Sequence, residues 1–493
     1  EKYLSSQSLE RRASQNIDLH PTDFPVESSY LNEIRNLNIP VVRSSKWLNA
    51  SSVYVSSQIE IDLLEALPFV EKVSPVKALK MTEVESFYKT NKSAAASLNY
   101  GDSKTQIQQL NGDFLHDQGY RGQGMMIAVI DGGFSDADLI GGFDSLWMNG
   151  RIVTSYDFVD NDTNVFHLGS HGRSVLSVMG GYIDGVYVGT APNANYVLLK
   201  SEDESSEKKV EEDNWVAAAE FADSVGADVI NSSLGYNTFD GGIGDYVYSD
   251  FDGRTTVVSQ GAVWAHRKGI LVVNSMGNEG SSSWQYMLSP ADADSILSIG
   301  GADGANNHVG FASVGPTFDG RLKPNVSALA TGVYVLSGSN TTQPGNGTSF
   351  AAPLISGLAA CLWQADPTLT NYQVLELIER SSNQHTNPDT LLGYGIPNFA
   401  LAFNNISIDE RSALLNLKIY PVPFGDELTV EGFDENQSEI EVSLTNLNGT
   451  SIETKSHFEN DKLVIDNLGS LSKGVYILTI ISNNKSSSFK VLK

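Results

Sequence analysis

The middle of the chain alternates short apolar runs with segments in which apolar residues recur at helical spacing. The runs are 125–130, 196–199, 227–230, 270–273 and 295–299. Helical spacing occurs over 210–225, where Trp215, Ala218, Ala219 and Ala222 form one stripe, and over 257–267. Continuous apolar strands separated by helices are typical of a parallel sheet covered on both faces. The pattern therefore predicts an α/β fold with a doubly wound, mostly parallel sheet between residues 98 and 408.

The chain before residue 98 has a different pattern. Helical spacing over 28–37 and 59–67 alternates with runs typical of strands over 39–42, 53–55 and 69–79. The polar and small residues 89–97 follow without any periodicity, and such exposed segments are where proteases cut. We therefore predict a small α+β domain over residues 1–97 with a cleavable connection to the sheet domain.

The last part of the chain, residues 409–493, has an all-β pattern. After a predicted linker at 409–416, short apolar segments alternate with turn residues such as Asn448-Gly449 and Lys473-Gly474. The predicted strands are 418–420, 427–430, 440–444, 462–465, 475–480 and 489–492. This spacing is typical of a β-sandwich.

Composition narrows the classes of function. The 493 residues carry a net charge of −27, with 32 Lys+Arg against 59 Asp+Glu, which disfavours nucleic-acid binding through phosphate contacts. The longest apolar stretch, 351–363, is broken by Pro353 and Gly357 and is shorter than the roughly 20 residues that span a bilayer. The one cysteine, Cys361, lies in this stretch, where we expect a buried structural thiol and no disulfide.

Polar residues follow several of the predicted strands. Asp131 ends the first run, 231–233 follow a later one, and 275–278 follow the next. Because reacting groups in such sheets lie outside the carboxyl ends of the strands, these residues are candidates for a shared site. His171, flanked by Gly169 and Gly172, opens a helical stripe elsewhere in the chain.

Ser349 is the candidate nucleophile. It lies among small residues in Asn346-Gly347-Thr348-Ser349-Phe350-Ala351-Ala352-Pro353, just before an apolar helical segment. We expect Pro353 in the first helical turn, where proline is tolerated. The octapeptide by itself fits a helix cap equally well. A serine nucleophile needs a base and an acid that orients the base, and His171 and Asp131 provide those residue types.

Taken together, these motifs resemble the subtilisin-like (subtilase) serine peptidases. The resemblance rests on Asp131-Gly132, His171-Gly172 and the octapeptide around Ser349, in that chain order, together with Gly277-Asn278. The family often has methionine where Phe350 stands and alanine where Met276 stands. The resemblance implies that Ser349 attacks the substrate carbonyl, His171 moves the proton and Asp131 orients His171. It also implies that Asn278 holds the oxyanion and that substrate is bound by Ser232, Ser233, Leu234, Gly235, Ser275, Met276 and Gly277.

The flanking domains carry resemblances of their own. Leu9-Glu10-Arg11-Arg12, 45–50 and 67–70 are similar to propeptides of subtilases from Bacteroidetes-type bacteria, which implies a folding chaperone and inhibitor cut near 92–100. Tyr420-Pro421-Val422-Pro423, with Val422 where asparagine is usual, and Gly474-Val475-Tyr476 resemble the sorting domain of type IX secretion. Leu447-Asn448-Gly449 belongs to the same resemblance. The implied partners are the chain's own propeptide and the secretion machinery, and the implied location is extracellular or on the cell surface.

No metal site can be assigned from the sequence. Asp160, Asn161, Asp162 and Asn164 suggest a calcium loop, but Val165 and His171 occupy the positions where an EF-hand needs glycine and an acid. We predict a solvated turn there, and solvated faces for the acidic residues 202–204 and 211–213. The predicted chemistry needs no cofactor, and a structural calcium, common in subtilases, stays open.

The resulting hypothesis is a secreted serine endopeptidase that acts on proteins and peptides through an acyl-enzyme and is made as a self-processing zymogen. One alternative is a catalytically silent homologue that serves as a surface binding protein, against which the intact Asp131, His171, Asn278 and Ser349 argue. Another is a serine-carboxyl peptidase of similar fold, which has glutamate for the histidine and aspartate for the oxyanion asparagine. We predict no nucleic-acid partner and no membrane span.

Overall fold

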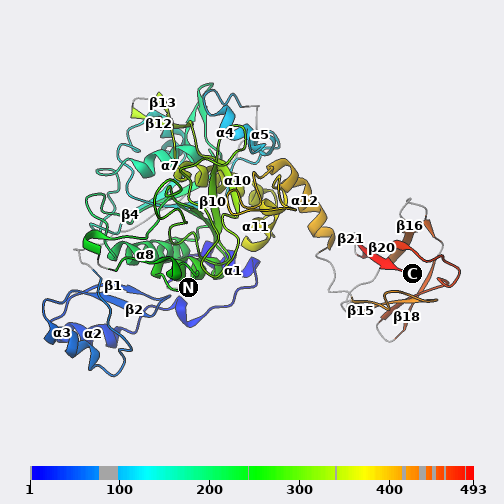
Figure 1. The fold of residues 1–493 in the computed structure, drawn as a ribbon, viewed down its shortest axis with the longest axis horizontal. Helices are drawn as coiled ribbons and strands as arrows, with labels where there is room; N and C mark the ends of the chain where they lie inside the picture. Colours follow the sequence, from blue (N-terminus) through cyan, green and yellow to red (C-terminus); the bar gives the residue numbers. More distant parts are fainter. Residues whose placement is uncertain are drawn as a thin grey trace. The chain divides into compact units, whose positions relative to one another are not determined.

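A computed structural model gives the fold (Figure 1). It describes residues 3–76, 98–242, 244–338, 341–412, 418–431, 440–446, 451–452, 454–459, 462–482 and 485–493. The chain forms two compact units, 1–402 and 403–493, and each is described by itself.

The first unit is built on a seven-stranded sheet with the order β11-β10-β9-β8-β3-β7-β4. Every neighbouring pair in it is parallel. In chain order the strands are β3 (Met126–Asp131), β4 (Ile152–Asp157), β7 (Asn195–Lys200), β8 (Val229–Ser232), β9 (Leu271–Ser275), β10 (Leu297–Ala302) and β11 (Val326–Leu329). The predicted parallel sheet is confirmed, with the ends of β3, β7, β8, β9 and β10 displaced by one to three residues. The edge strands β4 and β11 were not predicted.

Helices cover both faces of this sheet. One face is covered by α8 (Val210–Val225) and α9 (Val257–Arg267), the other by α7 (His171–Gly180) and α10 (Thr348–Ala365) (Figure 1). The predicted stripe of α8, from Trp215 to Ala222, is fully buried against Ile130 and Val197. Cys361 is buried in α10 as predicted, and its thiol donates to Thr190 O at 3.3 Å.

Smaller elements surround the sheet. They are α4 (Lys104–Gln108), α5 (Gly112–Asp117), α6 (Asp144–Met148), β5 (Tyr182–Ile183), β6 (Tyr187–Val188), β12 (Val333–Ser337), β13 (Thr341–Gly345), α11 (Asn371–Arg380) and α12 (Phe399–Ser412). Since α12 continues to Ser412, the predicted linker at 409–416 begins inside a helix. Its last residues, 413–416, lie outside the described part of the chain.

The N-terminal segment packs on α8. It contains α1 (Ser6–Ser14), α2 (Ser28–Asn36), α3 (Gln58–Glu65) and an antiparallel pair, β1 (Val41–Ser45) with β2 (Ala50–Val53). Trp47 inserts into the apolar core that α8 forms with the sheet. The strand predicted over 69–79 is wrong for residues 69–76, which pair with no other strand among the described residues.

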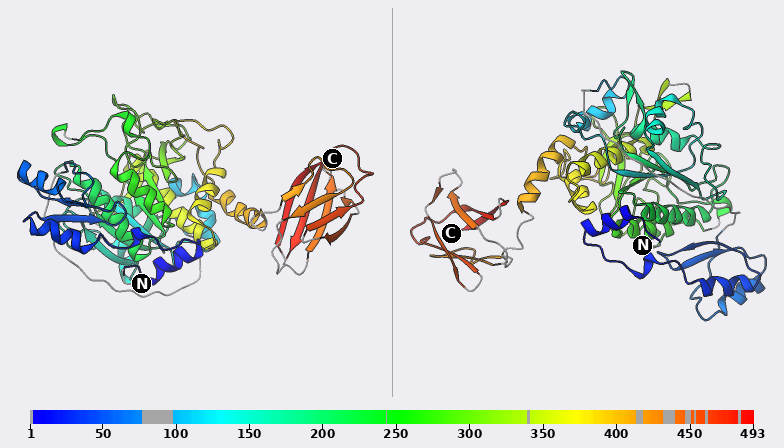
Figure 2. Two further views of the ribbon diagram at one scale, coloured as in Figure 1. Left: turned by 90° about the horizontal axis from the view of Figure 1, so that it is seen from below. Right: turned by 180° about the vertical axis from the view of Figure 1, so that it is seen from behind.

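The second unit is the predicted β-sandwich (Figure 2). Two four-stranded antiparallel sheets, β14-β15-β19-β18 and β17-β16-β20-β21, share one apolar core that includes Leu428, Ile465 and Leu478. The strands are β14 (Lys418–Tyr420), β15 (Leu428–Glu431), β16 (Ile440–Asn446), β17 (Ser451–Ile452), β18 (Lys455–Glu459), β19 (Lys462–Asp466), β20 (Val475–Ser482) and β21 (Lys485–Leu492). Of these, β17 and β18 were not predicted. None of the helices in the described residues is long and apolar enough to cross a membrane.

Candidate active site

Asp131 and His171 meet at the carboxyl end of the sheet. Asp131 is the last residue of β3 and fully buried, and His171 is the first residue of α7. The Nδ1 of His171 lies 2.8 Å from Asp131 Oδ1, which also accepts from the N–H of Gly132 at 2.8 Å. This contact fixes the ring orientation and places the other ring nitrogen, Nε2, away from the carboxylate.

The environment of His171 favours its protonated form. The Asp131 carboxylate raises the pKa of His171, with a further contribution from the carboxylate of Glu204, although burial opposes the shift. The His171 side chain is 38% exposed, so one side of the ring is open to an incoming molecule. A histidine held in this way can accept a proton and keep the resulting charge stabilised.

Ser349 is the second residue of α10, at the helix N-terminus as predicted. Pro353 lies in the second turn of α10, not in the first, so that part of the prediction was wrong. A proline there cannot donate to the carbonyl four residues earlier, which belongs to Ser349. The Oγ of Ser233 donates to that carbonyl at 2.9 Å and replaces the missing helical hydrogen bond.

The hydroxyl of Ser349 faces the same segment. Its Oγ donates to Ser233 O at 3.5 Å, which is too long for a strong hydrogen bond. Phe350, the next residue, places its ring 6.0 Å from the His171 ring between centroids. Phe350 therefore packs beside the histidine. The structure brings Ser349 to the same end of the sheet as the Asp131–His171 pair.

Asn278 is held through its carbonyl side. Its Oδ1 accepts from the N–H of Thr348 at 3.0 Å and from Thr348 Oγ1 at 3.1 Å. Because both donors occupy the oxygen, the Nδ2 amide group is left to donate elsewhere. Asn278 is exposed, and this amide lies beside Gly347 at the start of the turn that carries Ser349. The arrangement offers a side-chain N–H next to the backbone N–H groups of the α10 N-terminus.

The predicted substrate-binding residues have unequal surroundings. Ser232 is fully buried, and its Oγ accepts from Trp215 Nε1 at 3.0 Å, so its side chain supports the sheet. The carbonyls of Leu234 and Ser275 both accept from Asn274 Nδ2, at 3.2 and 2.7 Å. Asn274, which the sequence analysis did not single out, ties the two predicted substrate segments together.

Two glycines in these segments make room for one leucine. A Cβ at Gly235 or at Gly277 would lie 2.5 or 2.8 Å from atoms of Leu288. Met276 is fully buried and packs with Phe251, Met287 and Ala291. Met276 therefore lies behind the wall of the predicted specificity pocket, and Leu288 is the apolar residue that the glycines face.

An acidic pocket of about 450 Å³ opens beside the Asp131–His171 pair. It is lined by Asp131, Gly132, His171, Glu202, Asp203, Glu204, Ser205, Ser206, Glu207 and Leu234. A Cβ on Gly169 would lie 2.9 Å from Glu204 Oε1, which shows how closely that carboxylate approaches the turn before His171. Sequence reasoning missed Glu204, although its position just after β7 at the sheet edge was a usable signal.

The acidic residues near α8 are not the solvated face that we predicted. Glu211 and Glu212 are almost fully buried. Glu211 accepts from the backbone N–H groups of Asp203 and Lys208, and Glu212 accepts from Tyr246 and pairs with Lys209. Burial raises the pKa of Glu211 to about 7. These carboxyls organise the loop before α8.

Two groups among the described residues could hold a metal ion, Asp157–Asp160–His167 and Glu202–Glu207–Glu211. In the first, Asp157 already pairs with Lys200 at 2.7 Å. In the second, burial raises the pKa of Glu202 well above its ordinary value and that of Glu207 to about 7. A structural calcium stays a prediction. The turn at 160–164 is only partly solvated, because Asn161 is buried and accepts from Arg43 at 2.8 Å.

Comparison with known proteins identifies the family to which this fold and site belong. The model of the subtilase family matches residues 122–395, which is more than half of the chain. The chain belongs to the subtilase family. Subtilisin E of Bacillus subtilis (strain 168) is 32% identical over 301 residues, which covers 58% of this chain and 67% of that protein. Subtilisin of Bacillus pumilus is also 32% identical over 301 residues and is covered to 92%.

A solved structure supports the fold of this subtilase. MycP1 with its N-terminal propeptide removed superimposes with a TM-score of 0.50 at 21% identity, covering 61% of this chain and 96% of that one. The family match and the subtilisin relatives show a serine endopeptidase, and the likeness to MycP1 supports the α/β subtilisin-like fold that the sequence predicted.

The flanking domains also match family models. The Peptidase S8 propeptide domain of Bacteroidota matches residues 1–94, and the secretion system C-terminal sorting domain matches 418–493. The subtilase is therefore a secreted or cell-surface zymogen whose partners include its own propeptide and a secretion system. The predicted boundaries at 97/98 and 408/409 stay predictions, since 77–97 lie outside the described residues and the second falls within α12.

Proposed function

We propose that this subtilase hydrolyses peptide bonds through Asp131, His171 and Ser349. The observation that carries the proposal is the 2.8 Å contact between Asp131 and His171 at the sheet end where α10 presents Ser349. In the reaction, His171 Nε2 takes the proton of Ser349 Oγ as this oxygen attacks the substrate carbonyl. The protonated His171 then gives that proton to the leaving amine, and water repeats the sequence on the acyl-enzyme.

The oxyanion of each tetrahedral intermediate would be held by Asn278 Nδ2 and the backbone N–H of Ser349. Support comes from Thr348, which fixes the Oδ1 of Asn278 and thereby turns the amide outward. Donors fixed before the reaction stabilise developing charge without reorganisation, and one such donor contributes about 10²–10³ in kcat.

Substrate backbone would pair as an added strand with the segments 232–235 and 275–277, which leave the carboxyl ends of the central strands β8 and β9. The side chain before the cut bond would face Leu288, which fills the space beside Gly235 and Gly277. The substrates would be proteins and peptides in extended conformation.

Self-processing completes the proposal. Before cleavage the propeptide packs on α8 through α1 and β1, and the segment 92–100 connects it in sequence to the sheet domain. The intact chain would cut itself in this segment and then remain inhibited until the propeptide leaves.

The deciding experiment is Ser349→Ala in the full-length chain. We expect the variant to stay uncut between 92 and 100 and to lose about 10⁶-fold in kcat on unfolded casein. Wild-type protein treated with a serine-directed organophosphonate should lose the same activity, with the label on Ser349. Normal processing by the variant would exclude the proposed nucleophile, and a folded wild type that binds peptides without cutting them would favour the silent homologue.

A further inference from the structure

The first residues of the chain form an arm, residues 3–24, that contacts the sheet domain independently of β1 and β2. In the arm, α1 packs against the end of α8. The N–H of Ser5 donates to Ser224 O at 2.9 Å. Gln15 donates to Gly269 O at 2.9 Å and accepts from the N–H of Asn371 at 3.1 Å. The arm therefore binds several separate loops of the sheet domain.

Two buried arginines dominate this contact. Arg11 donates to Asp223 Oδ1 at 2.5 Å and to Ala227 O at 2.6 Å. Arg12 binds both carboxylate oxygens of Asp223, at 2.9 and 2.7 Å. Lys268 of the sheet domain pairs in return with Asp23 of the arm at 2.7 Å. All five side chains are at least nine-tenths buried.

Among the described residues, the direct ion-pair partners of Asp223 all come from the propeptide side, and Lys268 of the sheet domain acts on it only at longer range. These partners are Arg11, Arg12 and, at 3.8 Å, Lys46. No cation of the sheet domain itself pairs with this carboxylate in the part of the chain that the structure describes. The surface around Asp223 is thus complementary to a basic segment that comes from outside the sheet domain.

This surface lies at the amino ends of the strands. Ser224 and Ala227 precede β8, and Lys268 and Gly269 precede β9. Asp131 lies at the opposite end of β3, and at about 3.3 Å per residue the length of that strand separates the two edges by roughly 20 Å. The arm therefore binds at the edge of the sheet away from the candidate active site.

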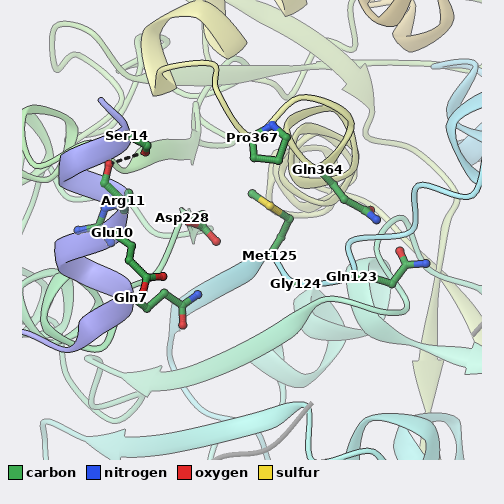
Figure 3. Close-up of a pocket in the computed structure, with 10 residues that line it drawn as sticks. All are labelled: Gln7, Glu10, Arg11, Ser14, Gln123, Gly124, Met125, Asp228, Gln364 and Pro367. Atoms are coloured by element: carbon green, nitrogen blue, oxygen red, sulfur yellow. Dashed lines mark hydrogen bonds between the residues drawn. The ribbon is translucent and has the colours of Figure 1, made fainter. Parts of the chain in front are cut away.

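The arm and the sheet domain also line an open pocket of about 610 Å³ (Figure 3). Gln7, Glu10, Arg11 and Ser14 of α1 face Met125, Asp228, Gln364 and Pro367 across it. Two glycines permit the approach beside it, since a Cβ on Gly226 or Gly269 would lie 2.8 Å from Gln7 or Gln15. The surface is shaped for the arm but is only partly filled by it.

We infer that the arm is a second anchor that keeps the cut propeptide bound to the enzyme through a docking surface remote from the catalytic cleft. Cleavage between 92 and 100 breaks none of the arm's contacts. The arm and the β1–β2 pair belong to one chain. If one of them detaches, the other still holds the propeptide on the enzyme, so the detached part rebinds intramolecularly. This slows the loss of the whole propeptide. Release of the active enzyme then depends on breaking the Arg11–Arg12–Asp223 cluster as well as on cutting the chain.

This inference rests on the proposed function, and its test is independent of activity. The full-length chain carries Ser349→Ala and a recognition sequence for a site-specific protease inserted after Lys92. After cutting, the dissociation rate of the labelled 1–92 fragment is measured by dilution and size exclusion. Arg11→Ala with Arg12→Ala is compared with Arg35→Ala, an exposed arginine of the same propeptide that contacts Asn32.

We expect the Arg35→Ala fragment to behave like wild type and the double variant to dissociate about 100-fold faster or more, as is typical when a buried charge pair loses one partner. Equal dissociation rates for all three fragments would overturn the inference. If the double variant does not fold, Gln15→Ala removes two milder contacts of the arm, and we expect about tenfold faster dissociation. An unchanged rate there would overturn the inference as well. Absence of peptidase activity in protein with Ser349 intact would contradict only the proposed function.

Discussion

Two buried aspartates lie at opposite edges of the same sheet and have opposite surroundings. At the carboxyl edge, Asp131 uses Oδ1 for His171 and Gly132, and its Oδ2 has no hydrogen-bond partner among the described residues. At the amino edge, Asp223 has both oxygens bound by arginines. The charge of Asp131 is only partly paired and acts on His171. The charge of Asp223 is neutralised by arginines of the propeptide, which is removable.

In the proposed roles of Asp131 and Asp223, one fold keeps reaction and regulation at opposite edges of the same sheet. Charge that is incompletely paired raises the pKa of a neighbouring base, as Asp131 does for His171. A charge that is fully paired in a buried contact, as Asp223 is, holds two segments together specifically. Removal of one partner then lowers stability strongly, because the other charge stays buried without a counter-charge. The length of the strands separates Asp131 from Asp223.

The largest expected effect is at the carboxyl edge. Asp131→Asn should lower kcat by about 10⁴-fold, because the amide cannot hold the His171 tautomer or stabilise its charge. Thermal unfolding of the variant should stay close to wild type, since the side chain keeps its shape. A loss of less than tenfold, measured on a peptide substrate, would contradict the orienting role of Asp131.

The same substitution at the amino edge should act on stability instead. Asp223→Asn leaves Arg11 buried without a carboxylate and Arg12 with Asp23 alone, at 2.9 Å, which should lower the free energy of unfolding of the uncut chain by about 3–5 kcal/mol. The uncut chain, held intact by Ser349→Ala, is unfolded in guanidinium chloride.

The matched control is the mature enzyme after removal of the propeptide. There the arginines are gone, and Asp223→Asn should change the free energy of unfolding by less than about 1 kcal/mol. Equal destabilisation of both forms would show that Asp223 serves the sheet domain itself.

The smallest expected effect is on the pKa of His171, the proposed base. The Glu204 carboxylate raises the pKa of His171, so Glu204→Gln should lower it. Since His171 must be neutral to accept the proton, the acidic limb of the kcat/KM profile should move to lower pH. Added salt should reduce the difference between variant and wild type, because Glu204 is exposed. Glu376→Gln on α11 serves as the control, and a profile that does not move would exclude the coupling.

The sequence was sufficient for five of the seven strands of the sheet, but not for β4 and β11 at its two edges. Apolar runs located β3, β7, β8, β9 and β10, because strands buried on both faces have few polar residues. The motifs around Asp131 and His171 identified a pair that the structure joins at 2.8 Å.

The rest depended on partners far away in the chain. Helix α1 was missed because its buried face consists of Ser8, Arg11 and Arg12, and these are buried only where Asp223 lies opposite. Likewise, the place of Pro353 in the second turn depends on Ser233, which replaces the lost hydrogen bond. Residues 69–76 have strand-like composition but no partner strand in the described structure, and extended backbone needs one.

The arm has a consequence for how the enzyme reaches its native state. Parallel pairing joins residues distant in sequence, such as Ile127 with Tyr196 and Val129 with Asn231, and such topologies fold slowly. By holding the loops before β8 and β9 together, the arm stabilises long-range order that the sheet domain must otherwise find by itself. Once the arm is lost, we expect the lifetime of the mature enzyme to be set by its rate of unfolding and not by an equilibrium.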